Sequence, residues 1–250
     1  MGFQREERIG WYLGLGCLAL VRCFYGTYFR CMRFIVRSCT SEYQLKGAAD
    51  TAAPKVFISH HQNMYGPIVS MKCLPEPVHL WVLSHFCNTK TCYNHLKNYT
   101  FSERFGWGRL RTFLVALLVS SPVSRLMKSA EAIPVYRESK KVMQTIEQSV
   151  DFLCKEENIL IFPDIDYTDD NSEMRDIYSG FLYLEKYYYE KTGKHLAFVP
   201  LYVSKNCHSI YFGKEIYFRD NVSFLEERQN VSKFIRNNLN DLAVLCGDLK

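Results

Sequence analysis

The sequence predicts an α/β protein with a largely parallel mixed sheet that is flanked by helices. Short runs of β-branched and aromatic residues alternate with longer segments of helical spacing along most of the chain. Two runs, Val56–Ile58 and Ile159–Phe162, are continuously apolar, which is typical of strands buried on both faces of a sheet. Hydrophobic residues make up 48% of the 250 residues, which is enough for a sizeable core.

The first forty residues differ from the rest. Residues 9–21 are apolar, and a helix of that length is about 20 Å long, too short to cross a bilayer. Residues 24–36 continue the apolar character, and four arginines share one helix face: Arg22, Arg30, Arg33 and Arg37. We expect a membrane-associating helical hairpin at residues 1–40, lying in the interface with its arginines on anionic headgroups. A pair of soluble core helices and a secretory signal are the alternatives.

The remaining elements are expected in the following order. Strands are predicted at 43–47, 55–59, 78–83, 132–136, 158–162 and 195–203, and residues 209–218 alternate like an antiparallel partner. Residues 48–54 form a connector. Helices are predicted at 113–127, with a break at Pro122, and at 139–155, 178–191 and 221–245. Neither a linker nor a repeat divides this part, so one α/β domain is expected at 41–250.

Charge and cysteine usage exclude several classes of protein. The net charge is only +5, so no nucleic-acid partner is expected. The ten cysteines are scattered without a CxxC pair, which argues against a zinc ribbon or a disulfide scaffold. Free thiols in a reducing compartment are the simpler interpretation.

The segment 55–67 (KVFISHHQNMYGP) carries the strongest functional signal. A buried strand ends at His60 and His61, and open α/β sheets carry their sites at the ends of such strands. Neutral imidazoles there suit proton transfer near neutral pH. A structural histidine pair and a metal site are the competing interpretations.

Several blocks in this order resemble the glycerolipid acyltransferase family, which includes lysophosphatidate acyltransferase. They cover most of residues 43–218: Gly47, Val56–Pro67, Ile133–Arg137, Ile159–Asp164 and Phe198–Leu201. The resemblance implies that His61 is the catalytic histidine and that Arg137 binds the acceptor anion. The aspartate of the family's first motif falls at Gly66, and the third motif keeps an acid at Asp164 but loses its Gly-Thr-Arg.

The resemblance also implies roles for the remaining candidates. His61 is expected to act as general base, while His60, Asp164 and Asp166 are candidates to orient it or to relay its proton. Asn63, Tyr65 and Gly66 are counted with Arg137 as substrate-binding residues. An Asp164-x-Asp166 pair also resembles the acidic motif that holds a divalent ion in some glycosyltransferases.

The expected function is transfer of a fatty acyl group from acyl-CoA or acyl carrier protein to a hydroxyl of a lipid or glycolipid. No cofactor beyond the acyl donor and no metal is expected, and the partner is membrane lipid at the cytoplasmic face. One alternative is a catalytically inactive member that binds lipid or a partner. The other is a metal-dependent transferase that uses Asp164 and Asp166.

Overall fold

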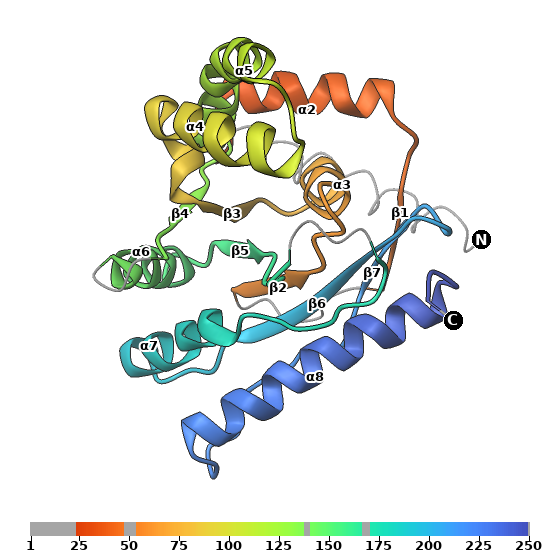
Figure 1. The fold of residues 1–250 in the computed structure, drawn as a ribbon. Coiled ribbons are helices and arrows are strands. Elements are labelled where there is room, and N and C mark those ends of the chain that lie inside the picture. The colour runs from red at the N-terminus through yellow and green to blue at the C-terminus, as the bar shows by residue number, and fades with distance from the viewer. Residues whose placement is uncertain (1–23, 48–53, 138–140, 167–170, 250) are drawn as a thin grey trace, which may run out of the picture. The chain divides into compact units, whose positions relative to one another are not determined.

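The computed structural model describes residues 24–47, 54–137, 141–166 and 171–249 (Figure 1). The chain divides into two compact units. The first comprises residues up to 35 together with 74–135, and the second comprises 36–73 together with the chain from 136 onward.

The second unit contains a five-stranded sheet in the order β1-β7-β6-β2-β5. Its strands are β1 (Gln44–Lys46), β2 (Lys55–Ser59), β5 (Asn158–Ile161), β6 (Ala197–Ser204) and β7 (Ser209–Phe212). The β6–β7 pair is antiparallel and the other neighbours are parallel. The predicted α/β class with a mostly parallel mixed sheet is therefore confirmed, and so is the antiparallel partner that begins at Ser209.

Helices cover this sheet on both faces. They are α3 (Tyr65–Cys73), α6 (Val142–Leu153), the 3-10 helix η3 (Ser179–Leu182), α7 (Tyr183–Thr192) and α8 (Phe224–Leu245). Figure 1 shows β6 between α3 and α8, which explains why every residue of β6 is buried. The Ser223 side chain accepts the Glu226 N–H at the start of α8, and the helix buries a stripe at every fourth position: Glu227, Val231, Ile235, Leu239 and Ala243.

The first unit is built mainly from helices around a two-stranded parallel ribbon. The strands are β3 (Val78–Leu83) and β4 (Ile133–Val135). The helices are α2 (Thr27–Cys39, with the unit boundary at residue 35), η1 (Ser84–Cys87), α4 (Thr89–His95), the π-helix η2 (Leu96–Arg104) and α5 (Arg109–Ser129). A small core joins α4, η2 and α5 through Cys92, Leu96, Phe101 and Ala116.

Some details differ from the sequence-based expectations. The break at Pro122 is wrong, since α5 continues through it. Proline removes only its own N–H bond, and the turns on either side of it remain helical.

The second helix of the predicted hairpin corresponds to α2, whereas the first lies outside the described residues, as do residues 48–53 of the connector. Helices α3, α4 and η2 were not predicted, because they lack a sustained apolar period.

A buried carboxylate is neutralised where α7 meets the start of β6. His195 contacts Glu185 through Nδ1 (2.5 Å) and Asp220 through Nε2 (2.9 Å). The second Glu185 oxygen accepts the Leu196 N–H at 2.8 Å. Burial raises the pKa of Glu185. Burial alone would lower the pKa of His195, but its bonds to the two carboxylates raise the pKa above its ordinary value. The charged imidazole thus links α7 to the chain beyond β7.

We predict that this histidine makes folding stability fall at alkaline pH. A raised folded-state pKa contributes stability that is fully present below the unfolded pKa of about 6.5 and is lost as the pH rises through the folded value. His195→Gln should remove that slope and cost about 2 kcal/mol in the free energy of unfolding, because Glu185 loses a charged partner. Urea unfolding across neutral and alkaline pH measures both effects. His85→Gln, at an exposed histidine, is the control. If the free energy of unfolding changed with pH in the same way in wild type and His195→Gln, the assignment of the slope to His195 would be refuted.

Candidate functional site

The candidate site lies at the carboxyl edge of three parallel strands of the second unit. The strands β5, β2 and β6 are neighbours, with Ile58 of β2 paired to Ile161 of β5 and to Pro200 of β6. His60 directly follows β2, which ends at Ser59, and Asp164 lies three residues after Ile161, the last residue of β5. The parallel register therefore brings these two side chains together, as open α/β sheets do at their strand ends.

Asp164 bridges the two histidines. Its Oδ1 forms a short hydrogen bond with Nδ1 of His60, and its Oδ2 accepts the main-chain N–H of His61 at 3.0 Å. Both His60 and Asp164 are buried. A buried carboxylate needs such partners, because burying a charged group without hydrogen bonds costs free energy. The carboxylate thus fixes the ring of one histidine and the backbone of the other.

The second ring nitrogen of His60 is also engaged. Nε2 lies 2.8 Å from the main-chain oxygen of Asn171. A carbonyl oxygen can only accept, so Nε2 carries a proton in this arrangement. Nδ1 faces the Asp164 carboxyl group, so both ring nitrogens of His60 are engaged. With only 3% of its surface exposed, the His60 ring is held from both sides and closed to solvent.

His61 is placed differently. It is half-buried, and its ring packs edge-on against Phe162 with the centroids 5.5 Å apart. The Asp164 bond reaches His61 through its main chain, whereas the carboxylate's ring contact is with His60. The residue that the family resemblance designates as the base is thus the more accessible of the two imidazoles.

A tight turn joins β2 to α3 directly after the histidines. Gln62 and Asn63 both have positive φ angles, of 43° and 59°. The amide of the buried Gln62 donates to the carbonyl of Val203 in β6 at 3.1 Å, and the Tyr65 N–H closes the turn on the Gln62 carbonyl at 3.2 Å. Such angles are uncommon for residues other than glycine, so these tertiary bonds hold the turn in place.

Gly66 has no room for a side chain. A Cβ built on it would lie 2.2 Å from the carbonyl oxygen of His60 and 3.0 Å from that of His61. The Gly66 N–H also donates to the His61 carbonyl at 3.1 Å. The aspartate expected from the resemblance could therefore not occupy this position without moving the histidine backbone. The acid near the histidines comes instead from the end of β5, as Asp164.

Tyr65 lies beside a second polar cluster at the same edge. Its hydroxyl forms a short hydrogen bond with that of Tyr43, and the Lys205 ammonium lies 5.2 Å from its ring centroid. Burial, followed by the bond with Tyr43, raises the pKa of Tyr65. The phenol thus stays protonated and available as a hydrogen-bond donor.

The other predicted residues are less closely connected with the histidines. Asp166 is exposed on the loop after Asp164, and Arg137 is exposed directly after β4. Neither side chain takes part in the bonds that hold the His60–Asp164 pair. The described residues contain no group of three histidine, cysteine or carboxylate side chains that could hold a metal. Each Asp164 oxygen already takes part in a hydrogen bond with one of the two histidines.

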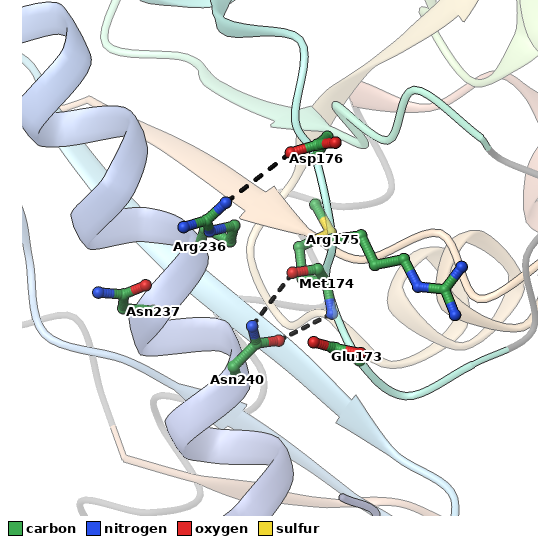
Figure 2. A pocket seen from close by; sticks show the side chains of 7 residues that line it. All are labelled: Glu173, Met174, Arg175, Asp176, Arg236, Asn237 and Asn240. Carbon is green, nitrogen blue, oxygen red and sulfur yellow. Dashed lines mark hydrogen bonds and ion pairs between the residues drawn. The ribbon is translucent and has the colours of Figure 1, made fainter.

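The segment after Asn171 is held firmly against the sheet edge. Asn240 of α8 forms two bonds to the Met174 main chain, at 2.7 and 3.1 Å (Figure 2). Ile177 pairs with Asp164 in an antiparallel bridge, and the Tyr178 N–H donates to the Pro163 carbonyl at 2.8 Å. These contacts keep the Asn171 carbonyl at His60. The His60–Asn171 contact uses a main-chain oxygen, and Asn240 is far from Met174 in sequence, so no sequence motif could have indicated these contacts.

Between this segment and α8 is a hollow of about 350 Å³. Figure 2 shows the residues that line it: Glu173, Met174, Arg175, Asp176, Arg236, Asn237 and Asn240. Its charges are mixed, and Arg236 lies 3.8 Å from Asp176. Neither histidine of the candidate site lines it, so this hollow does not coincide with the imidazoles.

Comparison with known proteins adds no assignment. No family model, no curated protein and no solved structure matches this chain.

We predict that the family's aspartate cannot be restored at position 66. Both Gly66→Ala and Gly66→Asp should lower the free energy of unfolding, by about 2 kcal/mol or more, because the new Cβ would displace the His60 carbonyl. Urea unfolding measures the loss. Gly108→Ala is the matched control, since nothing lies within 4 Å of its Cβ position. A Gly66→Asp protein as stable as the wild type would show that the turn tolerates an acid there.

Proposed function

We propose that the chain is an acyltransferase of the lysophospholipid type, acting at the cytoplasmic face of a membrane. It moves a fatty acyl group from acyl-CoA or acyl carrier protein to a hydroxyl of a lipid or glycolipid. The observation that carries this proposal is the bridge of Asp164 between the His60 ring and the His61 main chain at the carboxyl edge of the sheet. The ordered sequence blocks support the reaction class.

In this proposal His61 is the general base and His60 is a positioning residue. His60 already donates from Nε2 to a carbonyl and pairs with Asp164 through Nδ1, so it offers no lone pair to an incoming hydroxyl. The ring of His61 is half-buried and therefore more open to a substrate. Asp164 fixes the backbone from which that ring projects.

The chemistry requires one proton acceptor and a positioned thioester. A His61 nitrogen takes the proton from the acceptor hydroxyl as its oxygen attacks the thioester carbonyl. The tetrahedral intermediate collapses with cleavage of the C–S bond, and the imidazolium returns the proton to the leaving thiolate. Arg137, exposed after β4, would bind an anionic group of the acceptor with its fork of donors.

The first test is acyl transfer by His61→Ala. In detergent-solubilised protein, acceptor-dependent release of free thiol from acyl-CoA should fall by about 10³-fold or more, since the base is gone. His85→Ala removes an exposed histidine of the first unit and should retain full activity. Unchanged thiol release by His61→Ala would refute the role of His61.

Asp164→Asn tests the bridge itself. The substitution replaces the carboxylate opposite a buried imidazole, so the free energy of unfolding should fall by about 3 kcal/mol. Activity should fall as well, because the His61 backbone loses its anchor. The exposed Asp241 of α8, changed to Asn, is the matched control and should alter neither property. Wild-type stability in Asp164→Asn would show that the pair does not organise the site.

One observation favours a second function, that of a catalytically inactive lipid-binding or partner-binding protein. Position 66 cannot hold an orienting acid, and loss of such a group costs roughly 10⁴ in rate in the serine-protease template. This second function predicts no thiol release with any acceptor, together with lipid binding that His61→Ala leaves unchanged.

A further inference from the structure

Helix α5 has its large apolar side chains on the outside and its small ones on the inside. The buried positions recur every fourth residue and are small: Thr112, Ala116, Ser120 and Ser124. Of the six exposed positions between Arg109 and Val119, one is Arg111 and five carry large apolar side chains: Leu110, Phe113, Leu114, Leu117 and Leu118. Leu110 is 73% exposed and Leu118 is 72% exposed, so most of each side chain is left uncovered.

This arrangement is the reverse of that in a helix that faces water. Water drives large apolar side chains inward, as in α8, whose buried stripe contains Val231, Ile235 and Leu239. Helices in lipid pack through small residues that allow close backbone approach, and they turn larger apolar residues toward the acyl chains. The outward face of α5 therefore fits lipid better than water.

The inward side of α5 is occupied by the protein itself. Ala116 lies in one core with Cys92 of α4 and with Leu96 and Phe101 of η2. Outward residues of these elements include Lys90, Asn94 and Asn98, which are polar and exposed. Lipid can thus surround only one side of α5.

Charged residues border the apolar face at both ends, and aromatic residues border its start. The residues before it include Arg104, Phe105, Trp107 and Arg109, and Arg111 lies in its first turn with its guanidinium 3.9 Å from a Trp107 ring centroid. After it lie Arg125 and Lys128, both exposed. Helix α5 contains no aspartate or glutamate. Tryptophan and arginine at such borders are typical of the headgroup region, and their charge complements anionic lipid.

The length of the apolar face indicates how α5 would lie. By length and composition α5 would be able to cross a membrane, and it is the one such helix among the described residues. The large exposed side chains extend only from Leu110 to Leu118, about 12 Å along the axis. That length and the polar helices behind it suit a helix lying in the plane of the interface.

We propose that the outward face of α5 is a membrane-docking surface that inserts Leu110, Phe113, Leu114, Leu117 and Leu118 into a bilayer containing anionic lipids. The surface belongs to the first unit, whereas the histidines and Asp164 belong to the second. It therefore does not rest on the proposed acyl transfer. Residues 1–23 of this chain or a second copy are the competing occupants, and the experiment distinguishes them.

The test uses Trp107, at the border of the surface, as a local reporter in the full chain. Trp11→Phe and Trp81→Phe leave it as the single tryptophan. Mixed phosphatidylcholine–phosphatidylglycerol vesicles with brominated acyl chains should quench its emission, and vesicles of phosphatidylcholine alone should do so much less. Leu117→Asp with Leu118→Asp should weaken the apparent vesicle affinity at this site by at least roughly tenfold, because two leucines no longer enter the bilayer.

The matched control places two aspartates on α8 of the second unit. Leu225 is 61% exposed and Leu245 is 71% exposed, so Leu225→Asp with Leu245→Asp adds the same charge at equally exposed leucines. Quenching lost only in the α5 variant supports the proposal. Should the α5 aspartates also lower the melting temperature markedly, Leu117→Gln with Leu118→Gln replaces them in the same assay.

Two outcomes would overturn the proposal. One is the absence of Trp107 quenching in wild-type protein on anionic vesicles. The other is equal quenching in wild type and the α5 variants while the α5 variants dissociate a dimer or expose residues 1–23 to protease. That second result would assign the apolar face to a second copy or to the chain's own N-terminal segment.

Discussion

The site in the second unit depends on the buried carboxylate of Asp164. It joins the end of β5 to the end of β2, because its two oxygens bind the His60 ring and the His61 main chain. A charge in this position is tolerated only when it is paired and hydrogen-bonded. Two neighbouring hydrogen bonds stabilise the same region. The Asn171 carbonyl oxygen binds Nε2 of the His60 ring, and the Gln62 amide binds the following turn to β6. The two strand ends and the turn are therefore fixed together.

This constraint also explains how the chain departs from the family pattern that it resembles. The first turn of α3 packs so closely on the histidine backbone that position 66 accepts only glycine. An aspartate at position 66 of the first motif is therefore excluded because its Cβ would clash with the His60 carbonyl oxygen. An acid from β5 reaches the same pair of histidines, but it binds the ring of His60 and only the backbone of His61. The two imidazoles therefore differ, since both ring nitrogens of His60 are engaged, whereas His61 lies half-buried beside Phe162.

Helices α5 and α8 differ in which apolar side chains they bury. In the second unit, β6 and the inward stripe of α8 bury their large residues, as expected in water. In the first unit, α5 buries threonine, alanine and serine and exposes leucine and phenylalanine. Large apolar side chains thus face the core in α8 and the outer surface in α5. A contiguous exposed apolar surface of this kind marks an interaction site.

The sequence by itself determined the α/β class, most of the strands, the antiparallel partner at Ser209 and the placement of two histidines after a buried strand. These follow from local properties, namely hydrophobic period and strand-forming composition. Only the tertiary structure decided which acid serves which histidine, because strand order and register, not the motif, bring Asp164 to His60. It also decided that α5 continues through Pro122 and turns its leucines outward. Hydrophobic spacing predicts that a helix forms, but the neighbours of that helix determine which of its faces is covered.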